Sequence, residues 1–528
     1  MNPSVPPGYL GNEARITSGP APQMVAAGYA VETADAPLLH HGLGLADLAH
    51  LLALREADAV PEAPAAELAA EILRITRVRP GDFPYDPVYG DAYNSREREL
   101  ERRLGPAAGW LHTGRTRREA GRIAFRMALR HRILALHQAV TDFVTALGSQ
   151  AAAFAETVWA DNTYLQPAQP STFGHYLGGF GEEAARHLDR LEQAYALADQ
   201  APTGVGGVGG SRLPLDRAGM AERLGFAAAG AHTRDIMWAT DSVTDAALAA
   251  VQAALTADRL AEDLEIFTSP GFGYVTLDPS LCRASVLMPQ KRNPYALAVV
   301  RAGAGTLIGK ATGLLVTART PSARTDNWLH TYREVAAAVD SGCGIVALAA
   351  EIVRTLQVDA PALAAVAAEH FTGAADLAEE LVLRCRVDYR SAYRVVGRAV
   401  AEALDAGRSS LARNDLDRAA EAVLGRPLAI DEKAVLEALD PKHIVSTRTA
   451  VGGSAPERVR EHAAALLRRA DQAVAWCEGR RAHLRAAEEQ LLADAAALAS
   501  TAGRLPTPAT GTRPAHTADV RSADGEGR

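Results

Sequence analysis

Apolar residues recur at helical spacing through the middle of the chain. Leu136, Val140, Phe143 and Leu147 follow one another at steps of four, three and four residues, which places them on one face of a helix. Similar patterns recur in four further stretches, at residues 173–199, 218–265, 294–318 and 332–356. None of these stretches alternates as a strand would. A succession of long helices predicts an all-α fold with a long central helical bundle.

The pattern on either side of this region differs and predicts three domains. Short helical patterns separated by Pro- and Gly-rich turns predict an N-terminal helical domain over residues 1–112. Residues 113–365 form the predicted bundle, and residues 366–502 a C-terminal helical domain. Residues 503–528 are polar, rich in Pro and Gly and nearly devoid of large apolar groups, which predicts a disordered tail.

Composition agrees with a soluble helical protein. Hydrophobic residues reach 48% of the 528 residues although aromatic residues are only 5%, which suits packed helices better than sheets. The net charge of −8 and the lack of a basic stripe argue against a nucleic-acid partner. The four cysteines are widely spread, without metal-ligand spacing, which suits a reducing cytosol. No leader and no membrane-spanning run is evident, so we expect a cytoplasmic protein without membrane contact.

The stretch from Ala284 to Ala298 carries candidate chemistry. Ser285, Lys291 and Asn293 place a hydroxyl, an ammonium and an amide within nine positions, just after a loop rich in Gly and Pro. Only four of the 55 basic residues are lysines, so a lysine here suggests a need for a compact ammonium rather than a planar guanidinium. On composition alone, a solvated loop with an incidental lysine is equally acceptable.

This stretch, ASVLMPQKRNP, resembles the signature loop of the fumarase/aspartase/argininosuccinate lyase superfamily. The superfamily pattern is Gly-Ser-Ser-x-Met-Pro-x-Lys-x-Asn. Ala284 stands at the Gly, Ser285 at the first Ser and Val286 at the second. The remaining positions match outright, at Met288, Pro289, Lys291 and Asn293. The resemblance extends over about residues 25–470 and includes VGGSAPERV near the end of the chain.

A second segment, LHTGRTRREAGR, places four cations around a glycine turn at a helix start. Guanidinium groups and free backbone N–H groups at such a place form an anion site, although an ordinary charged helix start has the same composition. The segment resembles the argininosuccinate lyase motif His-Thr-Gly-Arg-Ser-Arg-Asn-Asp, which implies that Thr116 and Arg117 hold a substrate carboxylate. Arg118 replaces the Asn of the motif and makes the predicted pocket more cationic. Arg118 and Asn94 complete the predicted binding residues of this region.

A third segment, NTYLQPAQPSTFGHYLGG, interrupts helical sequence and on composition is an inter-helix loop. It resembles the superfamily's Thr-His-Leu-Gln-x-Ala-Gln-Pro, which implies Thr163 and Gln166 as substrate-binding residues. Tyr164 stands where the superfamily has a His, and Ala298 where it has the Glu that contacts this His. Both halves of that acid–base pair are therefore replaced. His175 is a weaker substitute candidate, because a lone His at a helix start more often packs or caps.

The segment PSARTDNWLHTYRE occupies the place at which argininosuccinate lyases carry a Tyr, a Gln and a Lys that bind the amino-acid end of the substrate. The same offsets give Arg324, Leu329 and Tyr332 here, and none matches. Arg324 and Tyr332 are kept as candidate substrate-binding residues of a rebuilt pocket.

The run GVGGVG, from Gly204 to Gly209, matches the dinucleotide-binding pattern G-x-G-x-x-G by letter. That pattern requires a preceding strand and a helix that opens within it, and the flanking sequences favour neither. The run resembles instead a Gly-rich turn between helices of argininosuccinate lyases.

The resemblance implies a lyase that cleaves a C–N bond beta to a carboxylate and releases fumarate, or adds an amine to fumarate in reverse. Ser285 would be the base, and Lys291 and Asn293 would stabilise the aci-carboxylate. Tyr164 is the only candidate acid that the resemblance offers. No metal ion or organic cofactor is implied, because there is no HExxH motif and the histidines do not cluster. The family also implies a homotetramer with composite sites for a small dicarboxylate.

The positions that select the substrate depart from the argininosuccinate lyase pattern. Leu329 cannot make the hydrogen bonds of a Gln, and Arg118 and Arg324 add positive charge where argininosuccinate would bring its own guanidinium. We therefore predict an N-succinyl substrate with a neutral or anionic leaving group. Argininosuccinate lyase proper, in arginine biosynthesis, is the alternative. A catalytically inactive structural homologue is the alternative of another class, against which the presence of Ser285, Lys291 and Asn293 argues.

Overall fold

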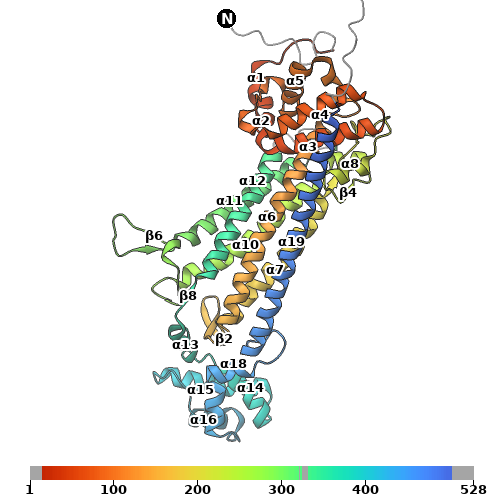
Figure 1. The fold of residues 1–528 in the computed structure, drawn as a ribbon. Coiled ribbons are helices and arrows are strands. Elements are labelled where there is room, and N and C mark those ends of the chain that lie inside the picture. The colour runs from red at the N-terminus through yellow and green to blue at the C-terminus, as the bar shows by residue number, and fades with distance from the viewer. Residues whose placement is uncertain (1–14, 320–321, 324–330, 502–528) are drawn as a thin grey trace, which may run out of the picture.

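A computed structural model describes residues 15–319, 322–323 and 331–501, and in these residues long helices dominate. The molecule is elongated, with a group of short helices at each end of a bundle of long ones (Figure 1). The predicted all-α class with a central bundle is confirmed. The long helices of the bundle are α6 (Arg117–Ala153), α7 (Phe173–Ala198), α10 (Asp241–Phe267), α11 (Tyr295–Ala318), α12 (Thr331–Arg354) and α19 (Pro456–Ala499).

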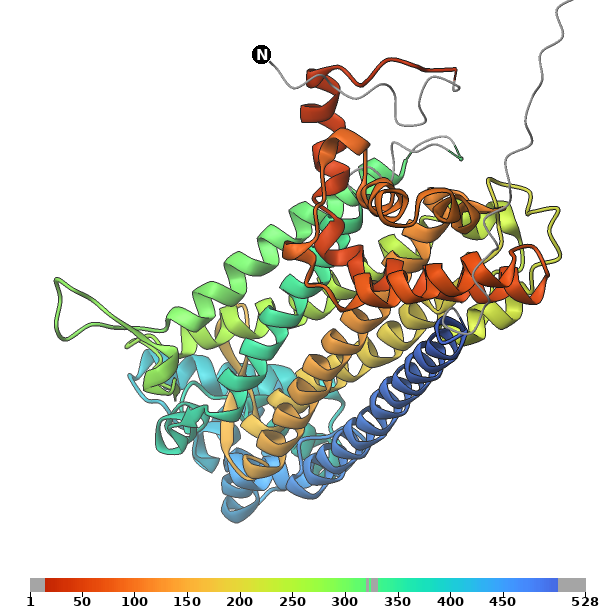
Figure 2. The ribbon, with the colours of Figure 1, turned by 45° about the horizontal axis from the view of Figure 1, so that its top comes forward.

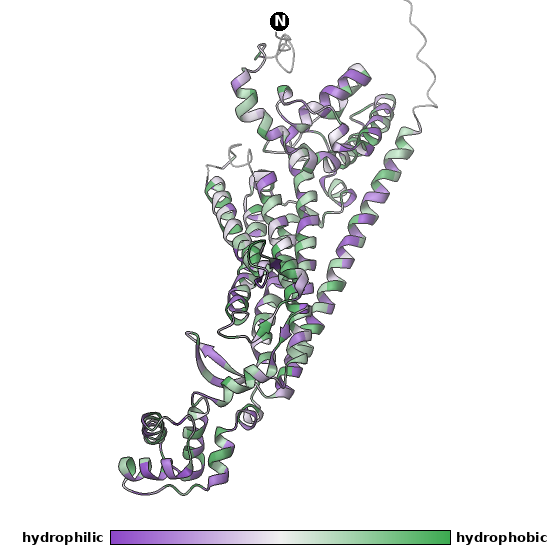
Figure 3. Cartoon of the chain, turned by 90° about the vertical axis from the view of Figure 1, so that its left-hand side faces the viewer, coloured by the Kyte–Doolittle hydropathy of each residue, from purple (hydrophilic) through white to green (hydrophobic). Residues whose placement is uncertain are grey.

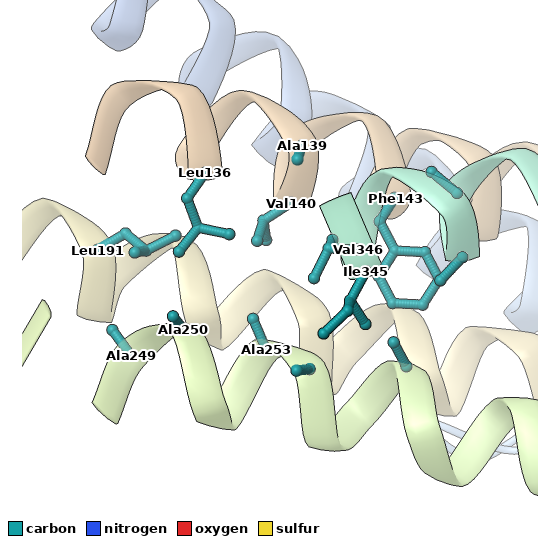
Figure 4. Packing of buried hydrophobic residues seen from close by; sticks show 14 of the residues in the cluster. Leu136, Ala139, Val140, Phe143, Leu191, Ala249, Ala250, Ala253, Ile345 and Val346 are labelled. Carbon is teal, nitrogen blue, oxygen red and sulfur yellow. The ribbon is translucent and has the colours of Figure 1, made fainter. Parts of the chain in front are cut away.

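The bundle core is built by the apolar faces that the sequence pattern predicts. Leu136, Val140 and Phe143 of α6 are at most 1% exposed. Leu136 and Val140 point toward Ala250 and Ala253 of α10, and Phe143 lies beside Val346 of α12 (Figure 4). Alanine on one helix lets the larger side chains of the neighbouring helix approach closely. The helix α6 packs against α7, α12 and α19, and these contacts fix where its two ends lie.

The N-terminal end of the bundle carries a second hydrophobic core. Leu48, Leu68 and Leu100 belong to it, and Leu491 near the end of α19 closes it from the C-terminal side. The helix α19 therefore extends over the whole bundle and ends against the N-terminal helices, and polar and apolar residues alternate along it (Figure 3). The N-terminal helices are α1 (Pro22–Met24), α2 (Ala30–Thr33), α3 (Ala36–Glu56), α4 (Glu62–Arg77) and α5 (Ala92–Leu104).

The opposite end has its own core around Leu381, Val395 and Leu416. Its helices are α13 (Ala360–Ala368), α14 (Ala374–Cys385), α15 (Tyr389–Asp405), α16 (Arg413–Leu424), α17 (Glu432–Leu439) and α18 (Pro441–Thr447). The three cores accord with three domains, but the boundaries at residues 112, 365 and 502 stay predictions. The predicted tail lies outside the described residues.

Strands occur only as short pairs in the described residues. The longest pair is an antiparallel hairpin of β1 (Val158–Thr163) and β2 (Gln166–Thr172), in a segment whose composition favours a loop. The other pairs are β3 (Gln200–Ala201) with β4 (Ala228–Ala229), β5 (Val275–Thr276) with β8 (Gln357–Val358), and β6 (Arg283–Ala284) with β7 (Arg292–Asn293).

The helix predicted over residues 218–265 is divided. The structure has α8 (Arg217–Arg223), then β4 and α9 (Thr233–Trp238), before α10 begins at Asp241. Gly225 ends α8 with a φ of +66°, a left-handed conformation that stops a helix and that glycine adopts without strain. The apolar periodicity continues across the break, so it does not reveal the interruption.

Two described helices, α11 and α12, are long and apolar enough to cross a membrane by length and composition. The sequence showed no uninterrupted apolar run because Arg301 and Lys310 divide α11. In their most apolar stretches, 28% of the α11 residues and 56% of the α12 residues are buried inside the molecule. Core helices of soluble proteins meet the same criterion, and both helices pack against α10 in the bundle.

Candidate active site

The start of α6 presents the predicted anion-binding residues. Thr116 is the N-cap of this helix, and its hydroxyl oxygen accepts the backbone N–H of Glu119 at 3.3 Å. Arg117 follows as the first helical residue, half-buried. The first turn of a helix carries unpaired N–H groups and the positive end of the helix dipole, both of which favour a bound carboxylate. The structure therefore places Thr116 and Arg117 at a helix start that favours an anion, and their role in substrate binding stays a prediction.

Carboxylates balance the guanidinium groups at this helix start. Arg118 forms an ion pair with Glu32 at 2.7 Å, with both side chains less than one-fifth exposed, and Arg117 lies 3.4 Å from Asp91. Burial lowers the pKa of Arg118, but the Glu32 carboxylate raises it, and the net direction is upward. Burial also raises the pKa of the neighbouring Asp35 to about 7. The expectation that Arg118 adds an unbalanced positive charge is therefore wrong, because Glu32 neutralises it.

Two further predicted residues belong to the same region. Tyr332, near the start of α12, is buried and stacks on Phe125 with ring centroids 4.3 Å apart. It lines one pocket together with Glu32, Asp35, Asp91, Arg117 and Arg118. Asn94 is also buried, but its side-chain amide donates to the Tyr89 carbonyl at 2.7 Å, so in this arrangement it holds a turn. Arg324 and Leu329 lie outside the described residues.

The signature segment forms a projecting hairpin in which β6 pairs with β7 (Figure 2). The hydroxyl oxygen of Ser285 accepts the backbone N–H groups of Leu287 at 3.3 Å and Met288 at 3.0 Å. Asn293 donates from its side chain to the Arg283 carbonyl at 2.9 Å, which closes the base of the hairpin. The hairpin therefore holds Ser285, Lys291 and Asn293 in one loop, and their convergence on one carboxyl group stays a prediction.

The contacts of Ser285 bear on its predicted role as base. Two N–H donors directed at one hydroxyl oxygen stabilise the deprotonated form more than the neutral form. Val286 and Leu287, at the tip of the hairpin, are exposed apolar residues, and Lys291 is exposed beside them. A loop with an apolar tip is suited to packing against another surface, where exclusion of water would strengthen these interactions.

The third group of residues lies at the turn of the β1–β2 hairpin. Thr163 pairs with Gln166, and both side chains are exposed. Between them Tyr164 and Leu165 have φ values of +55° and +59°, which bulky residues adopt only with strain. Tyr164 is 96% exposed at the tip, so its hydroxyl has no fixed neighbour in the single chain. Strained backbone conformations of this kind are frequent at functional sites.

The alternative acid, His175, is held at both ring nitrogens. Its Nδ1 lies 3.3 Å from the Ser171 hydroxyl and its Nε2 lies 3.0 Å from the Gly452 carbonyl. These contacts tie α7 to the turn that precedes α19 and fit a structural role. Ala298, at the position of the superfamily's Glu, is exposed on α11.

The three groups do not meet within one chain. Thr116 lies at the first residues of α6, and the β1–β2 hairpin follows the last ones. A helix of 37 residues spans about 55 Å, which is far beyond the size of a small substrate. The signature hairpin projects from the side of the bundle, away from both (Figures 1 and 2). The three groups are therefore too far apart in the single chain to contact one small substrate together.

Sequence reasoning missed two carboxylates of this region. Glu32, the partner of Arg118, is 86 residues away in the sequence, and no local pattern links the two. Glu119 is buried at the start of α6, and its carboxylate accepts the N–H groups of Gly204 and Gly206, each at 2.8 Å. The spacing of Thr116 and Glu119 is that of a capping box, a signal that could have drawn attention to Glu119.

A bundle of long helices with a projecting, hydroxyl-bearing hairpin fits the class of all-α lyases. Comparisons with known proteins agree. The model of a family described as Lyase matches residues 29–309, and one described as Argininosuccinate lyase C-terminal matches residues 371–446. The chain belongs to this family: it is an argininosuccinate lyase-like member of the fumarase/aspartase superfamily and a carbon–nitrogen lyase.

Individual relatives support the same assignment. An argininosuccinate lyase of Methanoculleus marisnigri is 32% identical over 458 residues, which cover 85% of this chain and 92% of the relative. Among solved structures, a variant of EDDS lyase with bound fumarate has a TM-score of 0.81 at 25% identity and covers 92% of this chain and 98% of its own. A 3-carboxy-cis,cis-muconate lactonizing enzyme from Pseudomonas putida, at 18% identity and a TM-score of 0.64, covers 84% of this chain and 99% of its own and shares the fold.

Proposed function

We propose that the chain releases fumarate by β-elimination from an N-substituted aspartate, or adds an amine to fumarate in the reverse direction. The observation that carries this proposal is the signature hairpin, in which Ser285 receives two N–H groups while Lys291 and Asn293 share its loop. The EDDS lyase variant of similar fold is described with bound fumarate, which supports fumarate as the common product.

The chemistry explains why these residue types are needed. The Cβ proton of a succinyl group is weakly acidic, so its removal requires a strong base and stabilisation of the carbanion as an aci-carboxylate. Ser285 is the proposed base, since N–H donors and a closed, cationic surrounding both favour its ionised form. Lys291 and Asn293 are the proposed partners of the developing charge, and Thr116, Arg117, Thr163 and Gln166 hold the carboxylates. Tyr164 is the proposed acid for the leaving nitrogen.

We propose a homotetramer in which each site takes its groups from several chains. The length of α6 supports this arrangement, because an antiparallel neighbour would bring the start of one α6 to the β1–β2 hairpin of another. Large apolar residues on more than one side of α11 also stay exposed in the single chain and would be covered by further copies. Among them are Val299, Ile308, Leu315 and Val316. Sedimentation should show a tetramer, and an active monomer would contradict this arrangement.

Two candidate substrates differ in the leaving group that they would release. The predicted preference for a neutral or anionic leaving group relied partly on Arg118 as an unbalanced cation, and the Glu32–Arg118 pair removes that part of the argument. Glu32 and Asp35 line the same pocket and could bind a cationic leaving group, which supports argininosuccinate lyase proper as the second candidate. The rebuilt positions Arg324 and Leu329 still favour a different N-succinyl substrate.

A substrate panel distinguishes the two candidates. We expect purified protein to release fumarate faster from an N-substituted aspartate with a neutral or anionic leaving group than from argininosuccinate. The rates should be compared as kcat/KM under one set of conditions. A kcat/KM for argininosuccinate of ~10⁴ M⁻¹s⁻¹ or more, and above all other substrates, would assign the chain to arginine biosynthesis.

The Glu32–Arg118 pair gives a second prediction about the substrate. Replacing Arg118 by asparagine, the residue of the argininosuccinate lyase motif, leaves the Glu32 carboxylate without its partner. We expect Arg118→Asn to raise the ratio of kcat/KM for argininosuccinate to kcat/KM for a substrate with an anionic leaving group by at least about tenfold. In the variant, Glu32 would pair with the guanidinium of argininosuccinate in place of Arg118. The double variant Arg118→Asn/Glu32→Gln should return this ratio toward the wild-type value. An unchanged ratio in Arg118→Asn would exclude Glu32 as a contact of the leaving group.

The proposal takes the protein to be cytoplasmic and its substrate to be a small dicarboxylate. The packing of α12 in the bundle and the proposed burial of α11 between chains account for their apolar character without a membrane. We propose no metal ion or organic cofactor, since the chemistry above needs only the side chains and N–H groups already named.

A further inference from the structure

The run GVGGVG, which matches a nucleotide-binding pattern by letter, encloses an anion of the chain itself. The loop approaches the start of α6, and the N–H groups of Gly204 and Gly206 donate to the two carboxylate oxygens of Glu119, each at 2.8 Å. Glu119 is 1% exposed. Backbone N–H groups in a glycine loop commonly bind a phosphate, and here the carboxylate occupies that place.

Only glycine fits the two donor positions of this loop. Gly204 and Gly206 have φ values of +63° and +58°, in the left-handed region that other residues adopt at a cost. A Cβ atom on Gly206 would lie 2.7 Å from the Gly210 carbonyl oxygen, and one on Gly204 would lie 2.7 Å from Cγ of Arg217. The conformation that directs both N–H groups at Glu119 is therefore specified by the glycines.

A second contact connects the loop to the carboxylate-binding residues. Gly206 donates its N–H to Glu119, and its carbonyl accepts the hydroxyl of Thr116 at 3.2 Å. Thr116 in turn accepts the backbone N–H of Glu119 at 3.3 Å. The three residues form a closed set of hydrogen bonds, so the orientation of the Thr116 hydroxyl and of the first turn of α6 depends on Glu119.

The loop itself is held firmly. Arg217 of α8 donates to the Thr203 carbonyl at 2.7 Å and to the Gly230 carbonyl at 2.8 Å. Burial raises the pKa of Glu119 to about 7, while Arg115 and the two N–H groups favour its ionised form. A carboxyl group buried in this place, one turn from the predicted substrate carboxylate, is costly for the fold and calls for a role.

We propose that Glu119 is a positioning residue for substrate binding, which fixes Thr116 and Arg117 through the loop from Gly204 to Gly210. The inference rests on the proposed function, because it takes a substrate carboxylate to bind at Thr116 and Arg117. Glu119 does not touch the substrate. Its carboxylate sets the conformation of the helix start, and the glycine run serves this carboxylate rather than a nucleotide.

The test compares Glu119→Gln with a matched control on the same helix. A glutamine amide can accept only one of the two N–H groups and directs a donor at the other. We expect the KM of the substrate and the Kd of fumarate each to rise at least about tenfold, because Thr116 and Arg117 are no longer held in the conformation that binds the carboxylate. The kcat should stay within about threefold, since binding and the transition state are weakened alike.

Asp199→Asn is the control. Asp199 is a buried carboxylate that accepts a hydrogen bond from Arg130 of α6 at 2.7 Å, and Arg130 lies about 20 Å along the helix from its start. We expect this variant to lower the thermal unfolding temperature as Glu119→Gln does, while KM and the Kd of fumarate stay at wild-type values. Glu119→Asp keeps the charge but shortens the side chain, and should restore part of the lost affinity.

The outcomes separate the inference from the proposed function. A folded Glu119→Gln with wild-type KM and fumarate Kd overturns the positioning role, even if its unfolding temperature is lowered. A wild-type protein that binds no fumarate overturns the proposed function itself, and the inference with it. If Glu119→Gln does not fold, Glu119→Asp and Gly206→Ala should show the same direction of change in Kd, and wild-type values in both would overturn the inference.

Discussion

Replacing Ser285 by alanine is expected to lower kcat by at least about 100-fold while the Kd of fumarate changes by no more than about threefold. Removal of a catalytic base typically costs a factor of 10² to 10⁴, and the hydroxyl acts in the transition state rather than in binding. The measurement is steady-state fumarate release together with fumarate binding to the same protein preparation.

A nearby hydroxyl provides the control for this substitution. Ser280 is exposed shortly before the signature hairpin and donates to Asp278 at 2.6 Å. Ser280→Ala removes a hydroxyl from the same region but no proposed catalytic group, so its kcat should stay close to the wild-type value. If Ser285→Ala retains more than about a tenth of the wild-type kcat, Ser285 is not the base.

Mixing two inactive variants is expected to restore activity. Ser285 lies on the signature hairpin and Thr163 on the β1–β2 hairpin, and the proposed tetramer supplies them to one site from different chains. After Ser285→Ala and Thr163→Ala chains are unfolded together and reassembled, about a quarter of the sites should contain both native residues if chains combine at random. The activity of the mixture should therefore approach about a quarter of the wild-type activity.

The matched control mixes two variants of the same hairpin. Ser285→Ala and Lys291→Ala chains each carry a damaged signature hairpin, so no combination of the two restores an intact one. This mixture should stay inactive. Equal activity of the two mixtures, or none in either despite confirmed exchange of chains, would show that Ser285 and Thr163 do not come from different chains.

The fold was predictable from the sequence because its strongest signal is local. Leu136, Val140 and Phe143 reveal the buried face of α6 by spacing alone, and the structure places them in the bundle core. The interruption between α8 and α10 was missed, since the apolar periodicity continues through it and the glycine at its start is a single residue. The β1–β2 hairpin was also missed, because its prolines and its turn of Tyr164 and Leu165 resemble a loop.

The motifs of the candidate site could be found in the sequence, but the electrostatics around them could not. The motif around Ser285 lies in the signature hairpin and the one around Thr116 lies at the start of α6, while the roles of these residues stay predictions. The charge at Arg118 was misjudged, since its partner Glu32 reaches it from a distant part of the chain. Long-range pairs of this kind leave no trace in one sequence, because neither the spacing nor the type of the two residues indicates the contact.

The release of fumarate, followed by its ultraviolet absorbance, tests the central claim most directly. Wild-type protein is incubated with a panel of N-substituted aspartates that includes argininosuccinate, beside Ser285→Ala at the same concentration. We predict that absorbance increases with at least one substrate in the wild type and not in Ser285→Ala. If the wild-type protein is a folded tetramer and releases fumarate from none of them, or if Ser285→Ala releases it equally fast, the chain is not the Ser285-dependent lyase proposed here, and the inactive structural homologue becomes the better account.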